Sequence, residues 1–154
     1  MKFTKKQIDR YSRQIILKKV GVIGQKKLLK SSVLVVGVGG LGSPIAIYLA
    51  ALGIGKIGII DKDSVEISNL SRQIIFSTND LKKSKTTVAI NKLRKINPDI
   101  KLNSFNKRLT KKNINQIAKN FDLIVDGSDN FRTRFLINDY CLKNRKILVS
   151  GAIS

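Results

Sequence analysis

The feature that most constrains the fold is the glycine-rich stretch VLVVGVGGLGSP at residues 33–44. It joins an apolar run to the pattern G-x-G-x-x-G, which Gly37, Gly39 and Gly42 form with Gly40 between them. Such an apolar run is typical of a strand buried inside a parallel sheet. The glycines allow a tight turn in which backbone N–H groups approach a phosphate at the start of the next helix. The stretch predicts strand, phosphate-binding turn and helix, but several nucleotide chemistries use this turn.

Strands and helices are expected to alternate through the rest of the chain. The expected strands cover residues 32–36, 56–61, 100–105, 121–126 and 147–150. The expected helices cover residues 4–17, 25–30, 43–52, 85–96, 111–120 and 130–143. Thr4 is expected to cap the first helix, and Gly21 and Gly24 to close it. This order predicts an α/β fold, in which a Rossmann-like, doubly wound, mainly parallel sheet has helices on both faces and an extra N-terminal helix. Residues 1–154 are expected to form a single domain. A ligand is expected at the carboxyl ends of the strands.

The formal net charge of +20 raises the question of nucleic acid. The lysines, however, are spread along the chain, mostly in pairs without interleaved aromatic residues, and they accompany many isoleucines and asparagines and a single glutamate. This pattern favours a background coding bias over a nucleic-acid footprint. Nucleic acid is therefore not the favoured partner, although the charge could still help to recruit an acidic protein.

Several classes of protein and site are not expected. No apolar run of about 18 residues is present to span a bilayer, and residues 1–10 lack the apolar core and cleavage site of a secretory signal, which predicts a cytoplasmic protein without membrane partners. Cys141 is the only cysteine and there is no histidine, so neither an internal disulfide nor a zinc site is expected and any metal should have oxygen ligands. Cys141 itself is expected to be a small buried residue.

The segment at residues 61–79 is long for a connection in a compact domain, which indicates a functional loop. It begins at Asp61, which ends an expected strand 24 residues after Gly37, where a carboxylate can accept hydrogen bonds from ribose hydroxyls. The loop then presents four further polar side chains: Asp63, Asn69, Arg72 and Gln73. Donors and acceptors of these kinds suit the ribose and phosphates of a nucleotide better than a nicotinamide.

Several separated motifs, taken together and in this order, resemble the adenylation domain of the ubiquitin-activating-enzyme-like (E1-like) adenylyltransferase family. They are RYSRQIIL at 10–17, GVGGLGS at 37–43, DKDSVEISNLSRQIIF at 61–76, Lys85, NP at 97–98 and DGSDNFRTR at 126–134. The resemblance extends from Arg10 to Ile153 and is strongest to the bacterial members that adenylate sulfur-carrier proteins in molybdopterin and thiamine synthesis.

This resemblance implies a reaction in which the C-terminal glycine carboxylate of a ubiquitin-like sulfur-carrier protein attacks the α-phosphate of ATP, giving an acyl-adenylate and pyrophosphate. Arg13 matches an arginine that reaches the ATP phosphates in a partner subunit, which implies a homodimer. Arg72 and Lys85 match residues that hold the phosphates, and Asp129 matches the aspartate that positions Mg²⁺. The resemblance places the following residues around the nucleotide: Gly37, Gly39, Gly40, Gly42, Asp61, Asp63, Asn69, Gln73, Ser128 and Asn130. Positioning and charge neutralisation suffice for such a transfer, so no histidine base is required.

Each charged residue in this set has a plainer alternative, because arginines and lysines are often solvated and aspartates often cap helices. That alternative is open for Arg13, Arg72, Lys85, Asp126 and Asp129. For Gln73 and Arg134 the functional role and the plainer role are equally favoured. For Arg72 and Asp129 the matching neighbours favour the functional role.

The chain also departs from the family, because full-length relatives continue past the strand matching KILVSGA. The missing part normally supplies the strands that clasp the carrier, a crossover loop and often a zinc site made by paired cysteines. A truncated member, or half of an enzyme that another chain completes, is therefore expected, and nucleotide binding is better supported than turnover. Three alternatives stay open: a non-catalytic nucleotide-binding or scaffold domain, a related ATP-dependent dehydratase of a modified adenosine in transfer RNA, and, last, a nicotinamide dehydrogenase.

Overall fold

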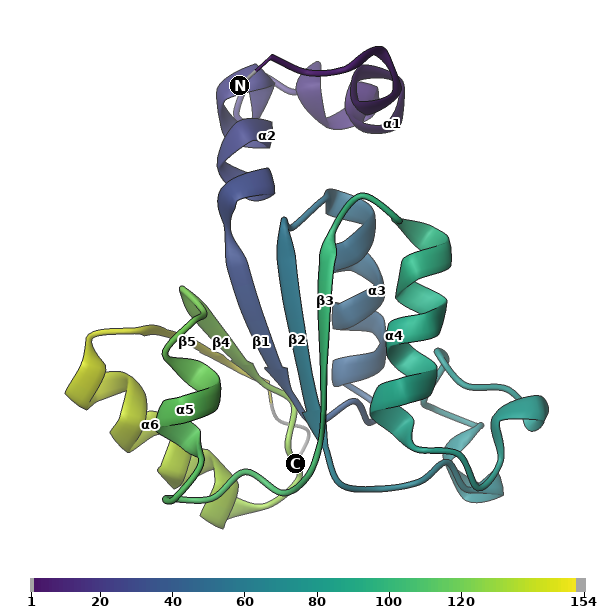
Figure 1. The fold of residues 1–154 in the computed structure, drawn as a ribbon, viewed down its shortest axis with the longest axis vertical. Coiled ribbons are helices and arrows are strands. Elements are labelled where there is room, and N and C mark those ends of the chain that lie inside the picture. Colours follow the sequence, from purple (N-terminus) through teal and green to yellow (C-terminus); the bar gives the residue numbers. More distant parts are fainter. Residues whose placement is uncertain (1, 152–154) are drawn as a thin grey trace.

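The computed structural model describes residues 2–151 (Figure 1). Its strands are β1 (Ser32–Val36), β2 (Lys56–Asp61), β3 (Lys101–Asn106), β4 (Leu123–Asp126) and β5 (Ile147–Ser150). Its α-helices are α1 (Lys5–Ile15), α2 (Gly21–Lys30), α3 (Gly42–Leu52), α4 (Lys85–Ile96), α5 (Ile114–Ala118) and α6 (Phe131–Asn144), and two 3₁₀ turns are η1 (Ile67–Asn69) and η2 (Thr78–Asp80). The strands pair in parallel in the order β3-β2-β1-β4-β5. The expected doubly wound α/β fold is confirmed.

The core forms two layers because alternate strand residues point to opposite faces of the sheet. Val33 and Val35 of β1 belong to the cluster that packs against α3 and α4, whereas Leu34 and Val36 belong to the cluster that packs against α5 and α6. Figure 1 shows these two pairs of helices on opposite sides of the sheet. Cys141 of α6 is buried in the second layer, as expected, and burial raises the pKa of its thiol.

Two expected helices differ in extent from those observed. Gly21 and Gly24 were expected to close the first helix, but Gly21 begins α2, and the Gly24 N–H donates to the Val20 carbonyl within a helical turn. The helix expected at 111–120 is the short α5. The Asn113 side chain accepts from the Thr110 N–H and donates to the Arg108 carbonyl, so the residues before Ile114 form a side-chain-stabilised turn instead.

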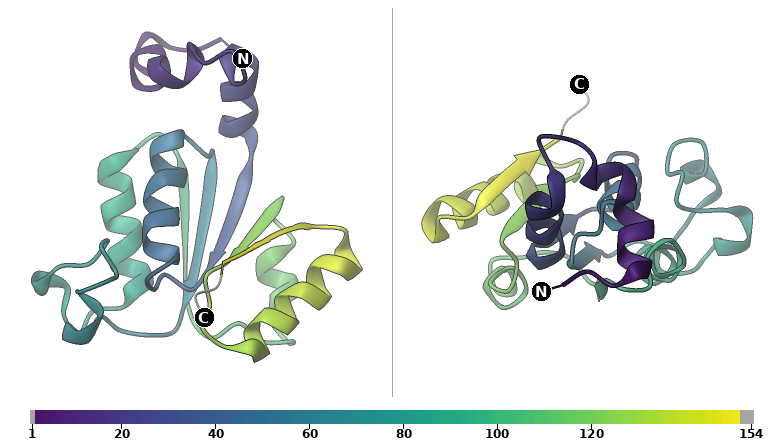
Figure 2. Two further views of the ribbon diagram at one scale, coloured as in Figure 1. Left: turned by 180° about the vertical axis from the view of Figure 1, so that it is seen from behind. Right: turned by 90° about the horizontal axis from the view of Figure 1, so that it is seen from above.

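α1 and α2 lie beyond the amino ends of the strands, at the end of the sheet opposite to the glycine turn (Figures 1 and 2). Thr4 caps α1 through a reciprocal capping box with Gln7, as expected for the cap. None of the helices within residues 2–151 has the length and apolar character needed to cross a bilayer.

Asp80 fixes the far side of the loop that joins β2 to α4. Lys92 Nζ of α4 lies 2.5 Å from Asp80 Oδ2, and the Ser77 N–H and hydroxyl donate to the same oxygen. Burial opposes ionisation of Asp80, but the hydrogen bonds from Lys92 and Ser77 outweigh it and lower the pKa of this carboxyl to about 2. The contact fastens the loop to the second half of α4.

We expect Lys92→Met to lower the free energy of unfolding at pH 7 by about 1–2 kcal/mol, allowing for partial solvent screening of the pair. Because the pKa of Asp80 lies below its ordinary value of 3.8, this stabilisation should be present above about pH 4 and lost as the pH falls toward 2. Urea unfolding at several pH values measures the difference. The control is Lys62→Met, whose pair with Asp63 is half exposed, with an expected change below about 0.5 kcal/mol. Equal effects of the two variants would contradict the role assigned to Lys92.

Candidate functional site

The glycine turn follows β1 and lies between β1 and β4, where the order in which successive strands are added to the sheet reverses. Gly37 has a φ of +82°, and a Cβ on Gly42 would lie 1.9 Å from the Gly37 carbonyl oxygen, so no other residue fits at position 42. A Cβ on Gly37 would lie 3.0 Å from the carbonyl oxygen of Gly127, which directly follows β4. The carboxyl ends of the two strands therefore meet at the turn, at the switch point where open parallel sheets bind ligands.

Asp61, at the carboxyl end of β2, joins this turn to the long loop. Its Oδ2 accepts from the Val38 N–H at 3.0 Å, and its Oδ1 accepts from the Asp63 N–H at 2.9 Å. Each oxygen keeps a further lone pair that can accept from a ribose hydroxyl. Asp61 therefore has a structural role at the end of β2, and this role is compatible with the predicted contact to a ribose.

We expect Asp61→Ala to weaken ATP binding by about 1–3 kcal/mol, roughly 5- to 150-fold, because hydrogen bonds to a charged acceptor are lost. The loss of the two backbone contacts should also lower the unfolding temperature, so calorimetric titration must be done well below it. Asp139→Ala, which removes an exposed carboxylate of α6 outside the candidate site, serves as the control and should bind ATP normally. An unchanged dissociation constant for Asp61→Ala would leave Asp61 with its structural role alone.

The loop returns over the glycine turn with Arg72 and Gln73. The η1 turn continues through hydrogen bonds from the Arg72 and Gln73 N–H groups to the Asn69 carbonyl. A Cβ on Gly40 would lie 3.6 Å from Arg72 Cγ, and one on Gly39 would lie 3.7 Å from the Gln73 amide nitrogen. Both side chains therefore border the space above the turn.

The buried amides of this loop differ in how far their polar atoms are satisfied. Gln73 is buried, and its Oε1 has no hydrogen-bond partner among residues 2–151. Asn69 is also buried, but its Oδ1 accepts from the Glu66 N–H at the start of η1. A buried amide oxygen without a partner beside a glycine turn fits a site that a polar ligand completes.

Lys85 is the first residue of α4, and its side chain is buried although it carries a charge. Its N–H donates to the Asp63 carbonyl at 3.0 Å, which links the start of α4 through Asp63 to Asp61. The residue is only 6% exposed, and within residues 2–151 its ammonium enters no hydrogen bond or ion pair. The positive end of a helix dipole is also an unfavourable place for a cation. An anionic ligand would neutralise this unpaired charge at the start of the helix.

The segment after β4 brings the other predicted residues to the same end of the sheet. Asn130 Oδ1 accepts from the Thr133 N–H and is therefore the cap of α6, a role for which Asp126 and Asp129 were the alternatives. Asp126 is buried and accepts from the Ser128 N–H and hydroxyl. Asp129 is exposed, which leaves its carboxylate available to a ligand. The nucleotide roles of Ser128, Asn130 and Asp129 stay predictions.

Arg134 has a structural role in this segment. Its guanidinium donates to the carbonyls of Ser128 and Gly151 at 2.9 and 3.0 Å and so joins the loop to the end of β5. Gly127, which packs against the glycine turn, was not predicted as a site residue. A glycine directly after a buried strand was the signal for it in the sequence.

Residues 2–151 contain no group of three or more His, Cys, Asp and Glu side chains that could hold a metal ion. Mg²⁺ that accompanies a nucleotide needs only one or two carboxylates in addition to phosphates, so Asp129 fits that mode.

Arg13 is exposed on α1, at the opposite end of the sheet, so the chain does not bring its own Arg13 together with Arg72 and Lys85 (Figure 1).

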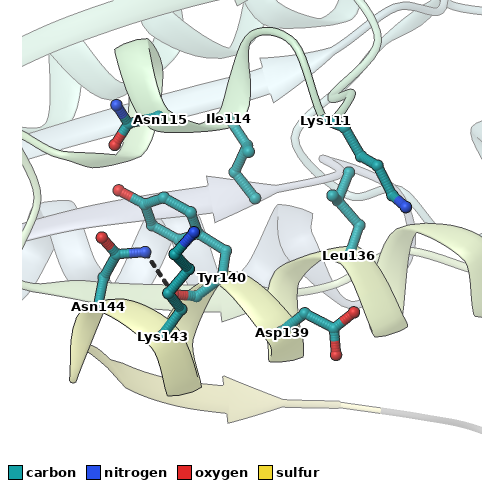
Figure 3. Close-up of a pocket in the computed structure, with 8 residues that line it drawn as sticks. All are labelled: Lys111, Ile114, Asn115, Leu136, Asp139, Tyr140, Lys143 and Asn144. Carbon is teal, nitrogen blue, oxygen red and sulfur yellow. Dashed lines mark hydrogen bonds between the residues drawn. The ribbon is translucent and has the colours of Figure 1, made fainter.

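A groove of about 600 Å³ between α5 and α6 lies apart from this site (Figure 3). Its volume would admit a nucleotide, but none of the predicted site residues lines it. Its walls mix Lys111 and Lys143 with Asp139 and apolar side chains, without a glycine turn. The candidate site is therefore formed by the glycine turn, Asp61, Arg72, Gln73 and Lys85, whose donors and positive charges can bind a nucleotide polyphosphate.

Comparison with known proteins agrees with the family resemblance of the sequence motifs. A model of the ThiF family matches residues 11–154. The chain is 46% identical over 153 residues to a sulfur carrier protein adenylyltransferase of Thermus thermophilus, covering 99% of this chain and 56% of that protein. It is 48% identical over 151 residues to a probable molybdopterin-synthase adenylyltransferase of Porphyra purpurea, covering 98% of this chain and 40% of that protein. The chain thus spans about half the length of the curated relatives it matches.

Among solved structures, the fold is similar to the E. coli tRNA N6-threonylcarbamoyladenosine dehydratase TcdA in complex with ATP. The TM-score is 0.88 at 26% sequence identity, covering all of this chain and 65% of that one.

Proposed function

The chain belongs to the ThiF family, and on this premise we propose that it binds ATP and adenylates the C-terminal glycine carboxylate of a ubiquitin-like sulfur-carrier protein. The observation that carries the proposal is Lys85: its side chain is almost fully enclosed, its ammonium has no hydrogen-bond or ion-pair partner among residues 2–151, and its backbone is linked through Asp63 and Asp61 to the glycine turn. The relatives of highest identity described above are sulfur-carrier and molybdopterin-synthase adenylyltransferases, which supports this substrate class.

The proposed reaction needs orientation and charge neutralisation more than proton transfer. Asp61 would hold the ribose, and the backbone N–H groups of the glycine turn would bind phosphate oxygens. Lys85 and Arg72 would neutralise the charge that develops as the carrier carboxylate attacks the α-phosphate and pyrophosphate leaves. Mg²⁺, held by Asp129 and phosphate oxygens, would supply further neutralisation of the leaving pyrophosphate.

The opposite placement of Arg13 supports a two-fold homodimer in which each Arg13 serves the other copy's site. In such a dimer, one copy would bring the amino end of its sheet to the carboxyl end of the other. A cytoplasmic location is part of the same proposal.

The experiment that tests the proposal is ATP–pyrophosphate exchange with labelled pyrophosphate, measured with and without candidate ubiquitin-like carriers that end in glycine. Exchange that depends on the carrier is expected. A carrier shortened by its terminal glycine is the matched control and should give none. Exchange that ignores the terminal glycine would contradict the proposed substrate.

Similarity to TcdA supports a second candidate function, the ATP-dependent dehydration of a modified adenosine in transfer RNA. The sulfur-carrier assignment is favoured because identity to that branch is 46–48%, against 26% to TcdA. The same assay distinguishes them when transfer RNA replaces the carrier. ATP binding without turnover of either substrate would favour the non-catalytic alternative for the chain by itself.

We expect the protein to bind Mg²⁺–ATP at least about tenfold more tightly than NAD, because Lys85 and Arg72 can neutralise a triphosphate whereas a dinucleotide carries less charge. Calorimetric titration with each ligand at one salt concentration measures the ratio. AMP should bind more weakly than ATP for the same reason. Tighter binding of NAD would overturn the assignment of the nucleotide.

A further inference from the structure

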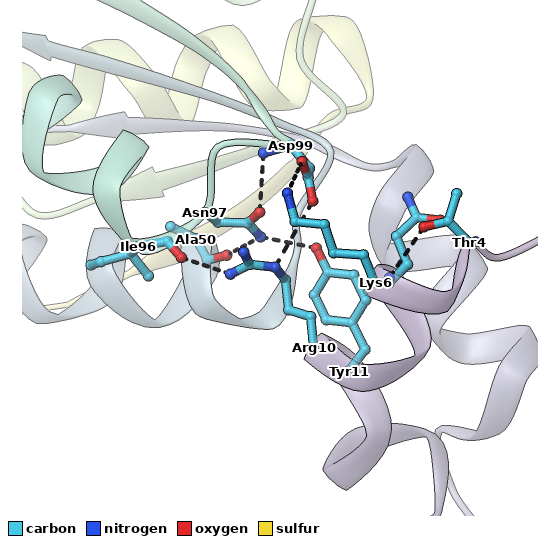
Figure 4. Close-up of polar contacts among 9 residues, drawn as sticks. Thr4, Lys6, Arg10, Tyr11, Ala50, Ile96, Asn97 and Asp99 are labelled. Carbon is cyan, nitrogen blue, oxygen red and sulfur yellow. Dashed lines mark hydrogen bonds and ion pairs between the residues drawn. The ribbon is translucent and has the colours of Figure 1, made fainter.

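Two motif residues to which the proposed function gives no role meet in the structure. Tyr11 belongs to the RYSRQIIL motif, and Asn97 belongs to the NP motif, 86 residues further along the chain. Both side chains are 0% exposed, and Asn97 Nδ2 donates to the Tyr11 hydroxyl at 2.9 Å (Figure 4). This buried pair joins α1 to the residue that follows α4.

Asn97 also hydrogen-bonds backbone groups near the carboxyl ends of α3 and α4. Asn97 Nδ2 donates to the Ala50 carbonyl near the end of α3 at 2.9 Å, and its Oδ1 accepts from the Asp99 N–H at 3.3 Å. The Tyr11 ring takes the space beside Gly53, where a Cβ would lie 2.6 Å from the ring. Tyr11 and Asn97 are thus fitted to one arrangement of α1 against α3 and α4.

Other side chains of α1 contact the same helix ends. Arg10 Nη1 donates to the Ile96 carbonyl at 2.7 Å, and Gln14 Nε2 donates to the Leu52 carbonyl at 3.3 Å. Arg13 lies between these residues in sequence but is exposed, and none of the hydrogen bonds within residues 2–151 involves its side chain. The docked side of α1 therefore sets where Arg13 projects from the molecule.

α3 and α4 begin in the candidate site, at Gly42 and Lys85, and end at this contact with α1. We propose that Tyr11 and Asn97 are positioning residues, which hold α1 so that Arg13 reaches the nucleotide bound by a second copy of the chain. This inference rests on the two-fold dimer of the proposed function. The alternative is that the pair supports only the nucleotide site of its own chain, through α3 and α4.

A heterodimer separates these two roles, because the two chains contribute differently to its one complete site. One chain carries Arg13→Ala and supplies the glycine turn and Asp129, and the other carries Asp129→Ala and supplies Arg13. The chains carry different affinity tags, so that the heterodimer can be purified. Tyr11→Phe, which keeps the ring against Gly53 and removes only the hydroxyl, is then placed on either chain.

The first measurement is the affinity of the heterodimer for Mg²⁺–ATP, and the second is pyrophosphate exchange with carrier. Tyr11→Phe on the chain that supplies Arg13 should weaken ATP binding at the complete site about tenfold, since a small displacement of an orienting group has effects of this order or larger. The same substitution on the Arg13→Ala chain should leave the affinity unchanged. Asn97→Ala should likewise weaken ATP binding when it is placed on the chain that supplies Arg13, and should have no effect on the Arg13→Ala chain.

The control substitution is Tyr48→Phe, which removes the hydroxyl of a tyrosine that is 68% exposed on α3, and it should have no effect on either chain. Thermal unfolding of each heterodimer shows whether the variants remain folded at the assay temperature. An effect of Tyr11→Phe only on the Arg13→Ala chain, or equal effects on both chains, would overturn the inference. If the heterodimer without Tyr11→Phe gains neither affinity nor exchange over its parents, the dimer itself is wrong and the inference fails with it.

Discussion

Replacing Lys85 by methionine should weaken ATP binding about 30- to 5000-fold and leave the protein as stable as before, or slightly more stable. Removal of one partner of a desolvated charge pair typically costs 2–5 kcal/mol of binding. Without ligand, the Lys85 ammonium has no partner within residues 2–151 and stands at the positive end of the α4 dipole, so its removal relieves an unfavourable charge. Methionine keeps most of the volume and apolar contacts of the lysine chain.

Calorimetric titration with Mg²⁺–ATP and urea unfolding together measure this effect. The matched control is Lys95→Met, at an exposed position in the last turn of the same helix, which should change neither quantity appreciably. The signature of a ligand-binding lysine is a large loss of affinity without a loss of stability. A loss of stability with unchanged affinity would make Lys85 a structural residue and would remove the main support of the proposed function.

Mixing two inactive variants should restore activity. Arg13→Ala and Asp129→Ala should each abolish pyrophosphate exchange, because in the proposed dimer each site needs Arg13 from one copy and Asp129 from the other. Random exchange of subunits at equal concentrations makes half of the dimers mixed, and each mixed dimer holds one complete site. About a quarter of the wild-type activity is therefore expected.

The measurement is exchange activity before and after subunit mixing, with the fraction of mixed dimers followed by two tags. A mixture of Lys85→Met and Asp129→Ala is the control. Both residues belong to the same copy's site, so its mixed dimers contain no site with both residues, and no recovery is expected. If the Arg13→Ala and Asp129→Ala mixture also stays inactive despite demonstrated exchange, or if sedimentation shows a monomer at every concentration, Arg13 does not act across an interface.

Two of the expected helix boundaries were wrong because glycine and asparagine are compatible with more than one local arrangement of the backbone. Gly21 and Gly24 are common helix terminators, yet both lie in α2. The helix expected from residue 111 begins only at Ile114, because the Asn113 side chain occupies the Thr110 N–H and the Arg108 carbonyl. The apolar periodicity of residues 111–120 is the same whether Asn113 lies inside a helix or stabilises a turn before it. The sequence pattern therefore could not distinguish the longer helix from the shorter one.

The sequence alone determined the succession of strands and helices along the chain, the glycine turn and the family. These rest on local patterns and on steric limits such as the one at Gly42. It also named Lys85, Arg72 and Asp61, but not their surroundings. The tertiary structure decided that Lys85 is buried without a counter-charge in the described residues and that Arg13 lies at the opposite end of the sheet. It also brought Tyr11 to Asn97. Burial and charge pairing depend on which distant segments pack together, and no window of the sequence contains that information.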